Sequence, residues 1–135
     1  MNKKLRVSEI KREQKKSFFL KEISALVGRI AADEPKLSSL FITRVELSAD
    51  SGICYVYFST HTEKVAFDEG LEVLKLYKPS IRKALAQSMR SRYVPNIVFK
   101  YDFAKEKERR ITALLDEIRQ EKTSDEYADE RKNQK

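Results

Sequence analysis

The sequence has few of the residues from which catalytic and metal centres are built. His61 is its only histidine, Cys54 its only cysteine, and it contains three glycines in 135 residues. No set of cysteines and histidines can surround a metal ion, and no glycine-rich loop can hold a phosphate. Glu63, close to His61, is an ordinary acid at the start of a helix. We therefore expect no enzyme, no cofactor, no metal and no small-molecule substrate.

The cysteine content and the hydropathy also bear on where the protein acts. A single cysteine excludes an intramolecular disulfide and fits a reducing compartment. Cys54 lies in an apolar run, so we expect a small core residue and not a reactive thiol. No segment approaches 18 apolar residues, and no leader-like stretch follows the basic start of the chain. These features predict a cytoplasmic protein that neither spans a membrane nor is exported.

Positive charge, in contrast, is abundant and concentrated. The chain has 28 basic and 21 acidic residues, a formal net charge of +7, and a pI of about 9.5. Residues 1–16 and 71–102 each contain seven basic and two acidic residues, whereas the other 87 residues sum to −3. Clustered Lys and Arg are typical of nucleic-acid binding, because a bound polyanion releases counterions. The alternative is a solvated basic surface without a partner.

Hydrophobic periodicity predicts a single α+β domain with tails. In the first expected helix, Phe19, Ile23 and Ile30 fall on one face, and Pro35 prevents the helix from continuing. The expected elements are a helix over 17–31, a hairpin of strands 40–47 and 53–58, a helix from 64 to 77, a second helix to 89, a strand over 97–102, and a short amphipathic helix at 111–118.

The expected second strand has two different faces. Cys54, Val56 and Phe58 alternate with Tyr55 and Tyr57, so one face should pack on helices while the other carries tyrosines. Those tyrosines could stack on bases, but we favour packing against a covering helix. Helix 111–118 is the candidate cover.

Proline and charge set the remaining boundaries. Pro79 lacks a backbone donor and clashes with the preceding turn, so it predicts the start of a separate helix and a sharp bend at Tyr77-Lys78-Pro79. Nine of the 15 residues from Glu121 onward are charged, which predicts a disordered tail. The order α-β-β-α-α-β with such a bend is the type II KH arrangement, in which helices cover one face of a three-stranded sheet.

Several motifs resemble those of bacterial ribosome-binding factor A. The segment Ser80–Ile97 looks like its I-R-S-x-L…R-L-R-x-V-P-E-L signature, and Asp33-Glu34-Pro35-Lys36-Leu37 resembles its D-P-R-L turn with one residue inserted. Val45–Asp50, Tyr55–Tyr57 and Tyr101-Asp102 resemble its V-x-x-S-x-D, K-V-Y-V and Y-D positions. We thus expect a basic extension at 1–16, a KH-like domain at 17–103, an appended helix at 104–120 and a disordered tail at 121–135.

The resemblance implies a non-enzymatic assembly factor. It also implies a link to growth in the cold, with which members of the family are associated. Such a factor binds the small (30S) ribosomal subunit and its 16S rRNA during late maturation, and we expect it to act as a monomer. The family has an A-x-G bend, whose place here is taken by Tyr77-Lys78-Pro79. The missing glycine argues against a mechanism that needs a left-handed residue at the bend.

The candidate RNA-binding residues are cations around this bend. Arg82, Lys83 and Arg90 fall outside the apolar positions of their helix, and cationic side chains pair with phosphates without reading sequence. The full expected set is Lys75, Lys78, Arg82, Lys83, Arg90 and Arg92.

Two other functions stay open at this point. One is a general KH-type RNA-binding protein that acts on other transcripts. The other is a protein-interaction module with a basic arm, which would use the tyrosine face or helix 111–118 as its contact.

Overall fold

The computed structural model describes residues 2–89 and 93–133, and the side chains of residues 7–89 and 93–122. The chain divides between Asp102 and Phe103 into two compact units. The first unit contains α1 (Asn2–Asp33), the short 3-10 helix η1 (Pro35–Leu37), β1 (Leu40–Leu47), β2 (Ile53–Thr60), α2 (Lys64–Ser88) and β3 (Asn96–Tyr101); the second contains α3 (Phe103–Asn133).

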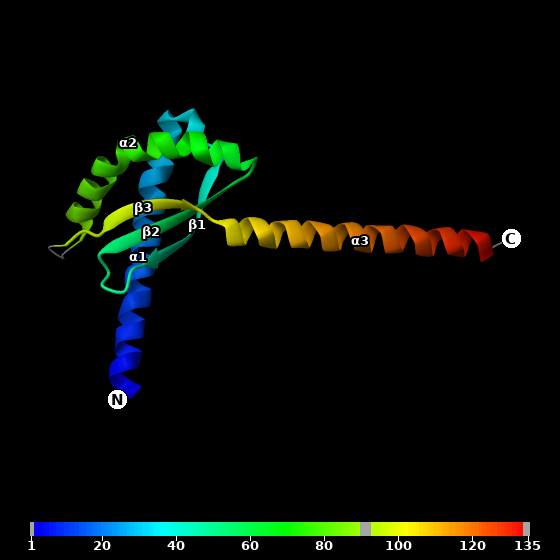
Figure 1. The fold of residues 1–135 in the computed structure, drawn as a ribbon, viewed down its shortest axis with the longest axis horizontal. Helices are drawn as coiled ribbons and strands as arrows, with labels where there is room; N and C mark the ends of the chain where they lie inside the picture. The colour runs from blue at the N-terminus through cyan, green and yellow to red at the C-terminus, as the bar shows by residue number, and fades with distance from the viewer. Residues whose placement is uncertain (1, 90–92, 134–135) are drawn as a thin grey trace. The chain divides into compact units, whose positions relative to one another are not determined.

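The three strands form one sheet in the order β1-β2-β3 (Figure 1). β1 pairs with β2 antiparallel, with Val45 opposite Val56, and β2 pairs with β3 parallel, with Val56 opposite Phe99. The turn between β1 and β2 places Ser51 at a φ of 59°. The sheet and the order of the elements confirm the predicted α+β, type II KH-like fold.

One face of the sheet forms the core. Cys54, Val56 and Phe58 are completely buried, whereas Tyr55 and Tyr57 on the other face are half-buried. This confirms the predicted alternation. The helices α1 and α2 cover the buried face with a shared set of apolar side chains: Phe19, Ile23, Val27, Phe67, Leu74, Ile81 and Leu85.

The prediction of two helices separated at Pro79 was wrong in one respect. The structure has one helix, α2, with Pro79 inside it, and Figure 1 shows the helix axis bending along its length. A proline costs the helix one backbone hydrogen bond and a local clash. Leu74 and Ile81, on either side of Pro79, are both buried against the sheet. Their burial holds the two predicted helices together as halves of one bent helix.

Both terminal helices are longer than the sequence predicted. α1 begins at Asn2, so the expected extension and the helix from residue 17 are one element. α3 continues to Asn133, past the end expected at residue 120. Both additions are rich in Lys, Glu, Arg and Gln, which have high helix propensity without tertiary contacts. Of the helices described here, none is both long and apolar enough to cross a bilayer.

Candidate nucleic-acid interface

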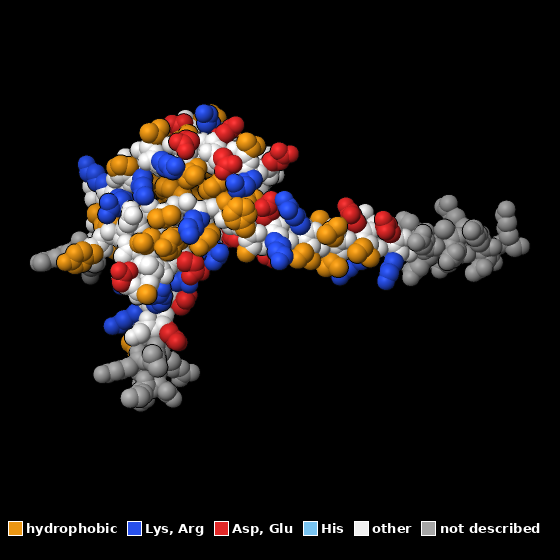
Figure 2. All heavy atoms as spheres, viewed as in Figure 1, with side chains coloured by type: hydrophobic (Ala, Val, Ile, Leu, Met, Phe, Trp, Pro, Cys, Tyr) orange, Lys and Arg blue, Asp and Glu red, His pale blue; other side chains and the backbone are white. Residues whose placement is uncertain are grey.

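Four of the six predicted RNA-binding residues lie on α2. Lys75, Arg82 and Lys83 are exposed and Lys78 is half-buried, and all four lie off the apolar face that packs on the sheet. Arg90 and Arg92 lie outside the described residues. Figure 2 shows Lys and Arg side chains on the part of the surface that α2 forms, with Asp and Glu side chains among them. The structure thus brings four cations of the expected set onto one helix.

The four cations are not equivalent. Lys75, Lys78 and Arg82 are spaced three and four residues apart, and therefore follow one flank of α2. Lys75 Nζ pairs with Glu72 Oε1 at 3.4 Å, and Arg82 Nη2 donates to the carbonyl of Val94 at 3.4 Å. Within the described residues, no carboxylate pairs with Lys78 or Lys83. These two lysines are the most available for phosphate contacts.

The predicted bend residues have a structural contact of their own. The hydroxyl of Tyr77 donates a hydrogen bond to Glu34 Oε1 at 2.8 Å, which joins α2 to the residue between α1 and η1. This bond to Glu34, with a smaller contribution from burial, raises the pKa of Tyr77 above its usual value. Tyr77 therefore helps to fix the middle of α2, beside Lys78.

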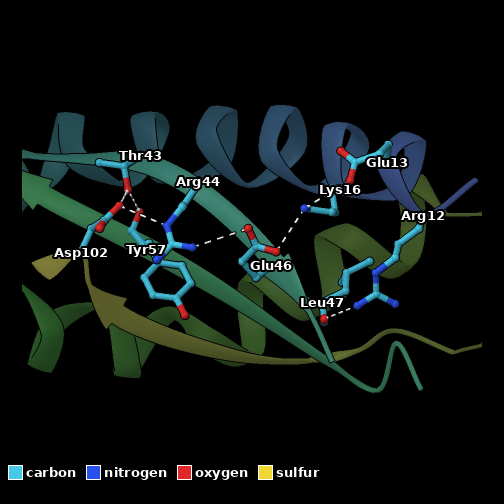
Figure 3. Close-up of polar contacts among 9 residues, drawn as sticks. All are labelled: Arg12, Glu13, Lys16, Thr43, Arg44, Glu46, Leu47, Tyr57 and Asp102. Atoms are coloured by element: carbon cyan, nitrogen blue, oxygen red, sulfur yellow. Dashed lines mark hydrogen bonds and ion pairs between the residues drawn. The ribbon is translucent and has the colours of Figure 1, made fainter. Parts of the chain in front are cut away.

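The basic N-terminal half of α1 is attached to the sheet. Arg12 Nη2 donates to the carbonyls of Leu47 and Ser48, and Lys16 Nζ pairs with Glu46 Oε2 at 3.1 Å (Figure 3). The hydrogen bond to Glu46 raises the pKa of Lys16. The sequence analysis missed these roles, because the contacts join residues about 30 or more positions apart.

A polar network continues along β1 to the end of β3. Thr43 Oγ1 donates to Asp102 Oδ2, and Arg44 Nε lies 3.3 Å from the same oxygen (Figure 3). The register of β1 with β2 shifts between Ile42 and Arg44, so Thr43 is the extra residue of a bulge. The bulge lets its hydroxyl reach the buried carboxylate of Asp102.

The tyrosine face carries cations from both neighbouring strands. The Arg44 guanidinium lies 3.9 Å from the centre of the Tyr57 ring, and Lys100 Nζ lies 4.6 Å from the centre of the Tyr55 ring. Such cation–π contacts occupy part of each ring surface. They make this face a less suitable base-stacking platform than two bare tyrosines would be. The covering role of helix 111–118 stays a prediction.

Groups that could support catalysis or metal binding are poorly placed for it. Cys54 is completely buried, and burial raises the pKa of its thiol to about 12, which confirms the expectation of a core residue. His61 packs its ring against Phe41, with centroids 4.6 Å apart. Among the residues that the structure describes, no three His, Cys, Asp or Glu side chains lie together as potential metal ligands.

A comparison with protein families shows which family the chain belongs to. The family model described as ribosome-binding factor A matches residues 11–115. The chain belongs to the ribosome-binding factor A family. The match begins inside α1 and includes the whole sheet and α2. It confirms the resemblance inferred from the motifs around Ser80–Ile97 and upstream.

Individual ribosome-binding factor A proteins agree with this assignment. One from Heliobacterium modesticaldum is 37% identical over 100 residues, which cover 72% of this chain and 83% of that protein. One from Thermomicrobium roseum is 32% identical over 111 residues, covering 82% and 85% respectively. The crystal structure of ribosome-binding factor A from Thermus thermophilus superposes with a TM-score of 0.58 at 22% identity, covering 67% of this chain and 93% of that one. At 22% identity, the similarity to the Thermus thermophilus structure is evidence for a shared fold only.

Proposed function

We propose that this protein is a non-enzymatic assembly factor that binds the small (30S) ribosomal subunit, contacts its 16S rRNA and assists the late maturation of the subunit. The observation that carries the proposal is the match of residues 11–115 to a family named for ribosome binding. The protein would act as a monomer in the cytoplasm, and its loss would impair growth most strongly in the cold.

The charge distribution supports an RNA partner. Lys75, Lys78, Arg82 and Lys83 lie on α2, and further cations lie on α1, so the positive charge is on two helices of the KH-like unit. Exposed Lys and Arg bind phosphate oxygens and release counterions. Such contacts to phosphates do not distinguish one base from another. Selectivity for the subunit would therefore come from the shape of the folded rRNA and from protein contacts.

The direct test is sedimentation of a cell lysate through a sucrose gradient with the protein followed by immunoblotting. Migration with the small subunit, lost after mild nuclease treatment, would support RNA-dependent subunit binding. Stoichiometric binding that survives nuclease treatment would favour a protein-interaction module. Recovery mainly of messenger RNA after cross-linking would favour a general RNA-binding KH protein. Depletion of the protein should also cause precursor 16S rRNA to accumulate, more strongly in the cold.

A further inference from the structure

A second group of cations lies on α1, on a different helix from the expected RNA-binding residues. Three cations and one serine recur at intervals of three and four residues, and so form one stripe along the helix: Ser8, Lys11, Arg12 and Lys15. Residues 2–10 of α1 precede the segment that matches the family model. The family match therefore does not account for this end of the helix.

The stripe faces a hollow of about 360 Å³, which α1 forms with the turn between β1 and β2. Glu9 and Ser51 complete its lining, and the structure describes the side chains of all the lining residues. Three cations and one carboxylate give this hollow a net charge of +2. A concave surface with several cationic donors suits a phosphate group, whose oxygens accept charge-assisted hydrogen bonds.

Two lysines of the stripe are available to a ligand. Lys11 and Lys15 are exposed, and within the described residues no carboxylate pairs with either of them. The neighbouring Lys16 differs, because it pairs with Glu13 and Glu46 and so serves to attach α1 to the sheet. Lysines without a carboxylate partner can pair with phosphates without first breaking an ion pair.

Arg12 fixes the two walls of the hollow against each other. Its Nη2 donates to the carbonyls of Leu47 and Ser48, which joins α1 to the start of the turn (Figure 3). A guanidinium has five N–H donors, so the donors on its other nitrogens stay available to a ligand. Because the walls are already joined, binding does not have to order them.

The turn contributes a side-chain hydroxyl to the hollow. The backbone N–H groups of Ser51 and Gly52 are used within the turn, by the carbonyl of Ser48 and by Asp50 Oδ1, each at 2.9 Å. These bonds hold Ser51 in place at its φ of 59°. Its hydroxyl makes no hydrogen bond to another described residue, so it can donate to a ligand.

We infer that this hollow binds a backbone phosphate of the rRNA, so that α1 and the turn form a second RNA contact besides α2. Lys11 and Lys15 pair with the phosphate oxygens, and Arg12 donates to them from the wall. RNA fits better than an acidic peptide, because one polyanion can follow the cations of both helices and release counterions at each. Such a contact positions the RNA without reading its bases. This inference rests on the proposed function and adds a contact surface to it.

The single cysteine of the chain permits a direct test. Cys54 is completely buried and the pKa of its thiol is about 12, so a thiol-reactive iron chelate will label only an introduced surface cysteine. The chelate produces hydroxyl radicals, which cut the nearest rRNA backbone in complexes with purified 30S subunits. Full-length Ser8→Cys carries the chelate at the hollow, and Ser80→Cys carries it on α2 beside Lys78. Ser17→Cys is the matched control, because its position nine residues after Ser8 lies on the opposite side of α1.

We expect labelled Ser8→Cys to cut the rRNA at nucleotides that labelled Ser80→Cys does not cut. Labelled Ser17→Cys should cut much more weakly than Ser8→Cys. Sedimentation will verify that each labelled variant binds subunits as the parent does, and thermal melts will verify that it folds. Both are expected, since Ser8, Ser17 and Ser80 are exposed.

Charge variants test the assigned contacts. Lys11→Gln/Lys15→Gln should weaken subunit binding and flatten the slope of log K against log salt by roughly two units. Lys21→Gln/Arg29→Gln is the matched control, with the same loss of charge from exposed positions elsewhere on α1, and should have a much smaller effect. Glu9→Gln should lower Kd by about two- to threefold, because it removes the one negative charge from the hollow.

Four results would overturn the inference. One is the absence of cuts by labelled Ser8→Cys where Ser80→Cys cuts, which is also the result expected if an acidic protein occupied the hollow. The others are equal cutting by Ser17→Cys, an unchanged salt slope in Lys11→Gln/Lys15→Gln, and weaker binding by Glu9→Gln. Each of these refutes the hollow alone as long as the parent binds subunits. A parent protein that does not bind subunits refutes the proposed function.

Discussion

The hydroxyl of Tyr77 donates a hydrogen bond to Glu34, 43 positions earlier in the chain, at 2.8 Å. The bond joins the middle of α2, where the predicted bend residues lie, to the residue between α1 and η1. It therefore contributes to the position of the cations on α2 as well as to the stability of the fold.

This bond makes a pH-dependent contribution to stability. It raises the pKa of Tyr77 above the ordinary value of 10.0, so the neutral phenol is favoured in the folded state. The contribution is complete below the unfolded pKa and is lost as the pH rises through the folded pKa. Tyr77→Phe should lower Tm at about pH 8, and the difference from the parent should shrink towards about pH 11. Melts followed by circular dichroism at several pH values will test this; a constant difference would contradict it.

Gly70 lies on α2 where the helix packs against Leu40 of β1 and Leu37 of η1. A Cβ at this position would lie 2.5 Å from Leu40 Cδ1 and 3.2 Å from Leu37 Cδ2. Gly70→Ala should therefore destabilise the protein by about 1–3 kcal/mol, although alanine has a higher helix propensity. Gly28→Ala is the matched control, since nothing lies within 4 Å of the added methyl group, and it should stabilise by up to about 1 kcal/mol. Urea denaturation of both variants measures the difference, and a stabilised Gly70→Ala would refute this description of the contact.

Cys54 is a probe of the core. Its thiol is completely buried and its pKa is raised to about 12 by burial. At about pH 8 a thiol reagent should label the native protein on the order of a thousandfold more slowly than the urea-unfolded chain. Labelling that is almost as fast in the native state would show that the face of β2 with Val56 and Phe58 opens readily.

Much of the fold follows from local patterns. The alternation of Cys54, Val56 and Phe58 with two tyrosines correctly predicted which face of β2 is buried. The motif in the segment Ser80–Ile97 correctly indicated the family. Both signals are contained in short segments, so they can be recognised without knowing what packs against them.

The sequence analysis was less successful where distant contacts decide the structure. Pro79 predicted a helix boundary, but burial of Leu74 and Ile81 on either side of it keeps α2 continuous. The attachment of Arg12 to Leu47 had no local signal at all.

The choice of cations for the central test follows from their contacts. Arg82 donates to the carbonyl of Val94, so its reversal could disturb the segment before β3 as well as remove a charge. Lys78 and Lys83 avoid this complication. Lys105 and Lys107 are the matched control, since they lie on α3, in a segment with nine basic and nine acidic residues.

The most direct test is the salt dependence of binding to purified 30S subunits for the parent, Lys78→Glu/Lys83→Glu and Lys105→Glu/Lys107→Glu. The α2 reversal should weaken binding and flatten the slope of log K against log salt by roughly two units, one for each lost phosphate contact, with Tm almost unchanged. The α3 reversal should have a much smaller effect on both. If the α2 reversal binds as tightly as the parent while the α3 reversal does not, α2 is not the surface that meets the RNA.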